Sequence, residues 1–231
     1  GDSIALGWGV AKEDVFVDNL EERLNEEKGS KTGFRFVTIN SGVGNYNTFY
    51  KVELFKEQLK VVDPDLVVLQ YYINDAEKNA IGRESFLLKH SLLIASIHYY
   101  LSIFSQEKKT LAEYYADIYK DESEGWKNAK KSLEELKMIC KKKQIPLIAL
   151  LIPDFHYLSI DNPLLPIYAK IQRTFDQNQI PMLNTFPGIY AEFGDEPKKA
   201  WVARDDPHPN KKVHQIISDL LYNFIDKQVF Y

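Results

Sequence analysis

The sequence predicts an α/β domain built on a parallel sheet. Short apolar runs recur along the chain, and stretches with helical periodicity separate them. Residues 65–70 and 145–152 are nearly continuous in apolar side chains, which is typical of parallel strands buried on both faces. Residues 34–39 alternate and are aromatic or β-branched, which predicts another strand, and residues 180–184 form a short last one.

Helices are predicted between these strands and after the last of them. In most of the predicted helices apolar residues recur every three or four positions. For the stretch 163–178, Pro163 in the first helical turn supports the prediction. The stretches are 13–25, 48–62, 122–143, 163–178 and 210–227. Gly29 and Ser30 are expected to end the first helix, and Asn210 suits the N-cap of the last.

Composition limits the class of protein. The chain of 231 residues fits one domain, with or without an insertion, and its 45% hydrophobic residues suffice for a sizeable core. A net charge of −4 provides no basic patch, so nucleic acid is not an expected partner. The single cysteine, Cys140, excludes an internal disulfide and a cysteine-based metal cluster, and a buried core thiol is expected there. No signal peptide or membrane-spanning segment is visible, which leaves the localisation open.

Four polar motifs follow the predicted strands or precede helices. They are Gly1-Asp2-Ser3, the glycine-containing loop 40–48, Tyr72-Ile73-Asn74-Asp75, and Asp205-Asp206-Pro207-His208. In open parallel sheets, binding and catalytic groups gather at the carboxyl ends of the strands. Each motif alone is weak evidence, because Ser3 could be a turn serine or helix cap and Asn74 a turn asparagine.

Together and in this order, the motifs resemble those of the SGNH/GDSL hydrolase family, and the resemblance covers almost the whole chain. It implies one three-layer α/β/α domain over residues 1–231, with a flavodoxin-like parallel sheet of strand order 2-1-3-4-5. The family's first strand would precede Gly1 and lie between strands 34–39 and 65–70, so we expect such a strand upstream.

The resemblance also implies roles for individual residues. Ser3 would attack an acyl ester, and His208, framed by two prolines, would take its proton. The family pattern Asp-x-x-His selects Asp205 to orient His208, whereas spacing alone leaves Asp206 as a rival.

An oxyanion hole would combine the Ser3 amide, the Asn74 side chain and an amide of Gly44 or Asn45. The chain departs from the family at Tyr72 and at Asn45, where glycine is usual. Asparagine tolerates the left-handed conformation nearly as well as glycine does.

The leading functional prediction is therefore a serine ester hydrolase that needs no cofactor or metal. Its substrate would be a small-molecule, carbohydrate or lipid acyl ester. An O-acyltransferase or deacetylase acting on a sugar ester is the first alternative, and a non-catalytic binding module of the same fold is the second. Asp154 and His156 form a short pair after a strand, either touching a substrate or belonging to a polar loop.

Residues 76–121 are too long for a simple loop and predict a helical insertion. Within it, residues 85–105 read as a helix that is apolar nearly all round. That helix would either pack on the sheet or form a cap beside Ser3. A cap would supply an apolar wall for an acyl chain, or dock on another subunit or a membrane surface.

Overall fold

A parallel sheet of three strands lies at the centre of the molecule. The computed structural model describes residues 1–78 and 109–229. Strands β1 (Val67–Tyr71), β2 (Leu147–Leu151) and β3 (Met182–Asn184) pair in the order β1-β2-β3. The α/β class with a parallel sheet, predicted from the apolar runs, is confirmed.

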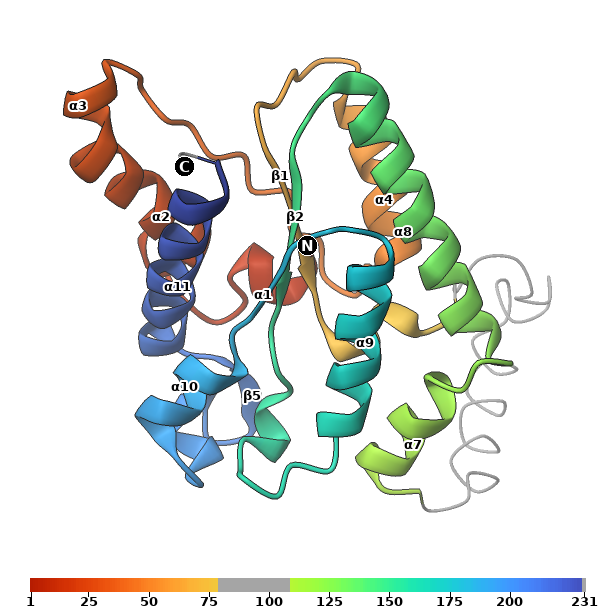
Figure 1. The fold of residues 1–231 in the computed structure, drawn as a ribbon. Coiled ribbons are helices and arrows are strands. Elements are labelled where there is room, and N and C mark those ends of the chain that lie inside the picture. Colours follow the sequence, from red (N-terminus) through yellow and green to blue (C-terminus); the bar gives the residue numbers. More distant parts are fainter. Residues whose placement is uncertain (79–108, 230–231) are drawn as a thin grey trace, which may run out of the picture.

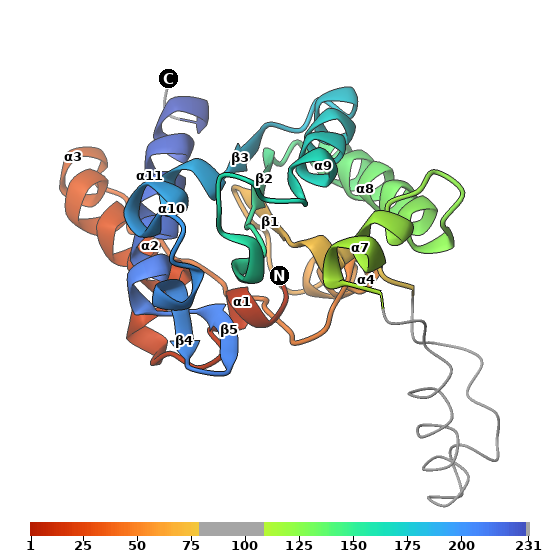
Figure 2. The same ribbon diagram turned by 90° about the horizontal axis from the view of Figure 1, so that it is seen from below.

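Helices cover both faces of this sheet (Figure 1). On one side lie α2 (Phe16–Leu24), α10 (Phe186–Phe193) and α11 (Lys211–Val229). On the other lie α4 (Thr48–Gln58), α8 (Glu124–Lys143) and α9 (Leu165–Gln177). The view along the strands shows the same three layers (Figure 2).

The central strand β2 explains why its sequence is apolar without interruption. Successive side chains of a strand point to opposite faces of the sheet. Ile148 and Leu150 are buried in the cluster formed with α2, α10 and α11, whereas Ala149 and Leu151 are buried in the cluster formed with α4, α8 and α9. Both faces therefore need apolar residues.

Several short elements complete the described chain. They are α1 (Ser3–Leu6), α3 (Ser30–Thr32), α7 (Leu111–Ile118), the 3₁₀ helices Lys12–Asp14, Ile73–Ala76 (η3), Phe155–Tyr157 (η4) and Pro197–Ala200, the π-helical turn Asn25–Gly29, and the antiparallel pair β4 (Trp201–Ala203) and β5 (Asp206–Pro209). The β4–β5 hairpin was not expected from the sequence.

The first long helix does not end where the sequence analysis placed its end. Gly29 keeps helical dihedral angles, with φ of −53°, and helical backbone continues through Thr32. Gly33 ends it with φ of +72°, a left-handed conformation that glycine adopts at little cost. Either glycine could have ended the helix, and only the second adopts the terminating conformation.

The predicted strand 34–39 does not join the sheet. The segment has no regular secondary structure, and its backbone is bound by side chains of the preceding helical stretch. Phe36 donates its N–H to Asn25 Oδ1 at 2.9 Å, and Asn25 Nδ2 donates to the Phe36 carbonyl at 2.8 Å. Thr38 donates its N–H to Glu21 at 2.6 Å. The strand prediction for this segment is therefore wrong, because strand propensity cannot specify what a backbone pairs with.

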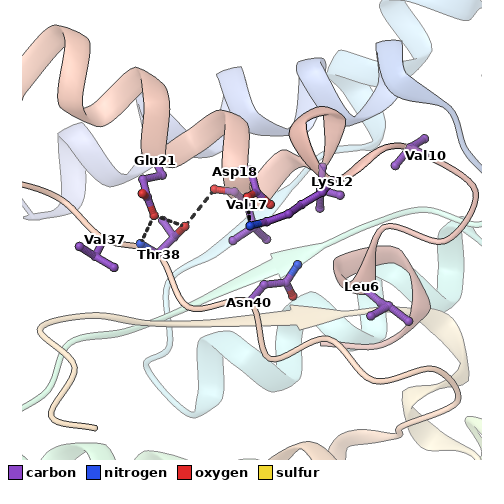
Figure 3. Close-up of a pocket in the computed structure, with 10 residues that line it drawn as sticks. Leu6, Val10, Lys12, Val17, Asp18, Glu21, Val37, Thr38 and Asn40 are labelled. Carbon is purple, nitrogen blue, oxygen red and sulfur yellow. Dashed lines mark hydrogen bonds and ion pairs between the residues drawn. The ribbon is translucent and has the colours of Figure 1, made fainter.

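A pocket of about 540 Å³ lies between α2, residues 37–40 and the end of α1 (Figure 3). Its lining mixes apolar and charged side chains, and the Thr38–Glu21 hydrogen bonds cross one end of it. Leu6, Val17 and Asn40 are among the residues that line it. The lining includes none of the four predicted polar side chains Ser3, Asn74, Asp205 and His208.

Two further expectations concern α8 and the insertion. Cys140 is buried in the core, as predicted, and burial raises the pKa of its thiol to about 11. The predicted helix 85–105 lies outside the described residues. After it, α7 leads to Tyr119, whose hydroxyl donates to the Ile73 carbonyl at 3.0 Å. Within residues 1–78 and 109–229, no helix is long and apolar enough to cross a membrane.

Candidate active site

Ser3 opens α1 and is fixed against the sheet by its neighbour Asp2. One carboxylate oxygen of Asp2 accepts the Ile4 N–H at 2.9 Å and so caps the helix. The Asp2 N–H donates to Gln70 Oε1 at 2.8 Å, and Gln70 Nε2 returns a bond to Asp2 Oδ2 at 3.1 Å. Because Gln70 is the penultimate residue of β1, this exchange seats the serine beside the carboxyl half of that strand.

His208 joins Ser3 to a carboxylate. Its Nε2 lies 3.0 Å from Ser3 Oγ, and its Nδ1 lies 2.6 Å from Asp206 Oδ1. The same Asp206 oxygen accepts the His208 backbone N–H at 3.0 Å. Burial raises the pKa of the Asp206 carboxyl, but hydrogen bonds from His208 and Trp8 outweigh this and hold it below its usual value. A serine hydroxyl, an imidazole and a carboxylate thus form one hydrogen-bonded chain.

The carboxylate in this chain is Asp206, whereas the family pattern had selected Asp205. Asp206 begins β5 and His208 lies two residues further along the same strand. Residues two apart in a strand point to the same face, so Asp206 and His208 can meet. Asp205 lies in the exposed turn between β4 and β5. The prediction that Asp205 contacts His208 is therefore wrong, because residues 206–209 form a strand and not the turn that a three-residue spacing would need.

The sequence analysis missed Trp8. Its indole Nε1 donates to the second carboxylate oxygen of Asp206 at 3.1 Å, and its ring centroid lies 5.9 Å from that of His208. Gly7 and Gly9 on either side adopt φ of +85° and +83°, which other residues rarely adopt. A tryptophan between two glycines, in the turn that follows the helix opened by Ser3, was the available signal.

The loop after residue 39 lies against α1. Asn40 Nδ2 donates to the Ala5 carbonyl at 2.6 Å, and the Val43 N–H donates to the Gly1 carbonyl at 3.2 Å. A Cβ atom on Gly42 would lie 2.2 Å from the Leu6 nitrogen, so this contact requires glycine. The loop that carries Gly44 and Asn45 is therefore anchored beside the start of α1.

Asn45 adopts the left-handed conformation, with φ of +63°, as expected for a residue that replaces glycine. Asn74 lies in η3, directly after β1. Its side-chain oxygen is buried and accepts no hydrogen bond within the described part of the chain. Which amides would complete an oxyanion hole stays a prediction.

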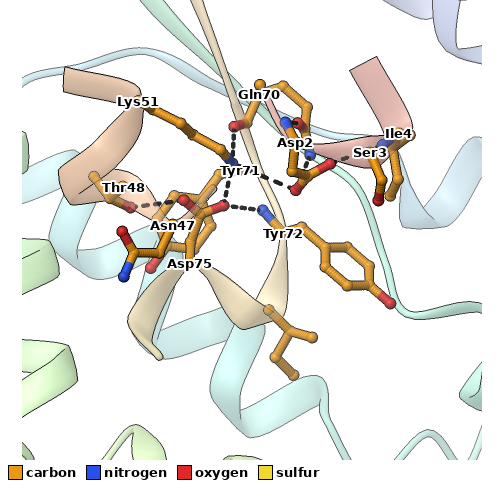
Figure 4. Close-up of polar contacts among 12 residues, drawn as sticks. Asp2, Ser3, Ile4, Asn47, Thr48, Lys51, Gln70, Tyr71, Tyr72 and Asp75 are labelled. Carbon is orange, nitrogen blue, oxygen red and sulfur yellow. Dashed lines mark hydrogen bonds and ion pairs between the residues drawn. The ribbon is translucent and has the colours of Figure 1, made fainter. Parts of the chain in front are cut away.

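A buried ion network joins Asp2, the residue before Ser3, to Asp75 in η3 (Figure 4). Lys51 Nζ, from α4, lies 2.6 Å from Asp75 Oδ2, 3.0 Å from the Gln70 carbonyl and 3.4 Å from Asp2 Oδ2. Burial alone would lower the pKa of Lys51, but the two carboxylates hold it above its usual value. Lys51 is therefore a buried lysine paired with two carboxylates, a role that its place in the sequence did not suggest.

A second aspartate–histidine pair follows β2. His156 Nδ1 lies 3.0 Å from Asp154 Oδ1, which also accepts the His156 N–H at 2.8 Å. The other Asp154 oxygen accepts the Tyr72 hydroxyl at 2.6 Å. Tyr72, the departure from the family pattern, thus binds the carboxylate of this pair. The His156 ring packs edge-on against Trp201, with centroids 5.6 Å apart.

In the part of the chain that the structure describes, no group of three His, Cys, Asp or Glu side chains is placed to hold a metal ion.

Comparison with known proteins finds likeness in structure only. No model of a known family matches the sequence, and no curated protein matches it. A psychrotrophic esterase, EstA from Pseudoalteromonas sp., superposes with a TM-score of 0.60 at 14% identity, covering 100% of this chain and 96% of that one. The acetyl xylan esterase AlAXEase gives 0.59 at 17% identity, covering 97% of this chain and 96% of that one.

A lipolytic protein of the G-D-S-L family from Desulfitobacterium hafniense gives a TM-score of 0.54 at 12% identity, covering 96% of this chain and 95% of that one. At such low identity these likenesses establish the fold. The α/β architecture implied by the four motifs is thereby confirmed, and the chain spans nearly the full length of each neighbour.

Proposed function

We propose that this protein hydrolyses acyl esters through an acyl-enzyme formed on Ser3. The observation that carries the proposal is the hydrogen-bonded chain from Ser3 Oγ through His208 to Asp206. Ser3 Oγ attacks the acyl carbon while His208 Nε2 takes the hydroxyl proton. Asp206 holds the proton on Nδ1 and stabilises the imidazolium. His208 then protonates the departing alcohol, and the C–O bond of the ester breaks.

A water molecule completes the reaction. His208 takes one of its protons as the oxygen attacks the acyl carbon, and Ser3 leaves with that proton restored. During both attacks, negative charge develops on the carbonyl oxygen. We assign its stabilisation to the Ser3 amide, the Asn74 side chain and an amide of Gly44 or Asn45. The Ser3 N–H supports this assignment because it donates to no acceptor within the described residues.

The neighbours support an ester as the substrate. Their names describe an esterase, an acetyl xylan esterase and a lipolytic protein, and the EstA structure was solved inhibited by monoethylphosphonate. A phosphonate that traps a serine hydroxyl is therefore a suitable probe here. Acyl transfer to a sugar hydroxyl would use the same acyl-enzyme, with the sugar in place of water.

The test uses chromogenic esters of rising acyl length, each with and without a sugar acceptor. Ser3→Ala should lower kcat by roughly 10⁴-fold or more, by analogy with other serine hydrolases. Ser30→Ala, at an exposed position in α3, is the matched control and should keep full activity. A phosphonate should add its mass to Ser3 alone.

If the wild-type protein cleaves no ester and gains no phosphonate mass, the proposal is wrong. Hydrolysis that continues after Ser3→Ala would also remove Ser3 as the nucleophile. An acylated sugar in the acceptor reactions would favour transfer over hydrolysis.

A further inference from the structure

Three charged side chains lie buried beneath the proposed catalytic groups, yet the reaction touches none of them. Asp2, Lys51 and Asp75 are each at most 5% exposed. Asp2 directly precedes Ser3, and Asp75 directly follows Asn74. The network therefore lies one residue away from both the proposed nucleophile and a proposed oxyanion donor.

Among the side chains of the described residues, Lys51 is the only one whose ammonium pairs with both carboxylates. A buried charge is costly unless it is paired and its hydrogen bonds are satisfied. The ammonium group has three donors, and it finds Asp75 Oδ2 at 2.6 Å, the Gln70 carbonyl at 3.0 Å and Asp2 Oδ2 at 3.4 Å. Without Lys51, two carboxylates would face each other in a site of low dielectric constant, where they repel unless one of them takes up a proton.

The helix that carries Lys51 also binds the Asn74 segment through its first turn. Thr48 Oγ1 donates to the second oxygen of Asp75 at 2.8 Å, and Asn47 Nδ2 donates to the Glu77 carbonyl at 2.9 Å. Asp75 in turn accepts the Tyr72 N–H at 2.7 Å, which closes η3 around Asn74. The start of α4 thus fixes η3, and Lys51 alone extends this anchor to Asp2.

We propose that Lys51 is a positioning residue that sets the placement of Asn74 relative to Ser3. The inference rests on the proposed function, because it assigns a purpose to the distance between nucleophile and oxyanion donor. The ammonium draws Asp2 and Asp75 toward one point, so the α1 N-terminus and η3 keep one separation (Figure 4). Lys51 itself does not reach the substrate.

The first test is Lys51→Met, which keeps the length of the side chain and removes its charge. Repulsion between Asp2 and Asp75 should move η3 away from Ser3. A misplacement of about 1 Å can cost on the order of 10²-fold in rate. We expect kcat to fall by roughly 10- to 100-fold, with KM nearly unchanged, because the group lost acts on the transition state through Asn74.

The matched control is Lys56→Met in the same helix. Lys56 pairs with Glu53 and Glu135 at the protein surface, so its loss should leave kcat unchanged. The double variant Lys51→Met/Asp75→Asn removes the repulsion together with the cation. It should fold more stably than the single variant and recover part, but not all, of the lost kcat, because the ammonium that ties Asp2 to η3 is still missing.

Wild-type activity and phosphonate labelling of Ser3 are measured first, so a failure of the proposed function is seen separately. With an active wild type, a folded Lys51→Met that keeps kcat within about twofold overturns the inference, as does a change confined to KM. If the single variant does not fold, the double variant decides. A folded double variant with wild-type kcat and wild-type stability then shows that the cation is dispensable, whereas a lowered kcat at unchanged KM supports the positioning role.

Discussion

The two aspartate–histidine pairs share one local geometry and differ in what surrounds it. In Asp206-Pro207-His208 and in Asp154-Phe155-His156, a single carboxylate oxygen accepts both the backbone N–H and the ring Nδ1 of the histidine two residues later. The remaining carboxylate oxygen is bound by an aromatic side chain in each case, Trp8 in the first and Tyr72 in the second.

The difference lies at the other ring nitrogen. His208 Nε2 meets the hydroxyl of Ser3, which is 205 residues away in the sequence. His156 packs its ring against Trp201. An aspartate two residues before a histidine is therefore enough to orient an imidazole. Whether that imidazole can act as a base depends on a group that only the tertiary fold supplies.

The largest expected effect separates the two histidines. His208→Gln should lower kcat on the order of 10⁴-fold or more, because within the described residues His208 is the base that contacts Ser3 Oγ. His156→Gln should leave kcat nearly unchanged. Steady-state kinetics on one ester, with thermal unfolding as the check on folding, measure both. Equal losses in the two variants would mean that both pairs serve the reaction.

The second prediction separates the two aspartates beside His208. Asp206→Asn should lower kcat by roughly 10³- to 10⁴-fold, because the amide can neither fix the tautomer nor stabilise the imidazolium. Asp205→Asn, in the exposed turn, is the matched control and should have little effect. The opposite result would restore the Asp-x-x-His assignment and would require the hairpin to rearrange when substrate binds.

These two aspartates show how far the sequence could lead. The motifs predicted the fold class and the meeting of Ser3 with His208, because both lie at the carboxyl edge of a parallel sheet. They selected the wrong carboxylate because the β4–β5 hairpin is short and has little apolar alternation. The strand period of two, which places Asp206 beside His208, was therefore not visible.

Lys51 and the segment 34–39 show a second limit. Lys51 lies in a helix among other lysines and glutamates, and nothing local separates a buried lysine from an exposed one. Its burial follows from two carboxylates that arrive from other parts of the chain. In the same way, residues 34–39 have the composition of a strand, but Asn25 and Glu21 bind their backbone instead. Pairing is a long-range property in both cases.

A third prediction concerns Asn74, the proposed oxyanion donor beside the Ser3–His208 pair. Asn74→Ala should lower kcat on the order of 10²- to 10³-fold, the usual loss for one oxyanion donor, with little change in stability. A combined Asn74→Ala/Lys51→Met variant should lose little more than the larger single loss, because both act on one donor. Additive losses in a double-mutant cycle would show that Lys51 acts elsewhere, and full activity of Asn74→Ala would remove Asn74 from the site.

The smallest expected effect concerns the stability that the second pair contributes. The hydrogen bond from Asp154 raises the pKa of His156 above its usual value of 6.5, and burial offsets part of this. A raised folded-state pKa means that protonated His156 stabilises the fold fully below about pH 6.5, and that this stabilisation is lost as the pH rises through the folded-state pKa. His156 is partly exposed, so solvent screens the pair and the effect should be small.

Urea unfolding of the wild-type protein and of His156→Gln at pH 5.5 and pH 9 measures this effect, and titrations common to both proteins cancel in the difference. The free energy of unfolding of the wild type should exceed that of His156→Gln by more at pH 5.5 than at pH 9. An equal difference at both pH values would mean that Asp154 holds a neutral imidazole.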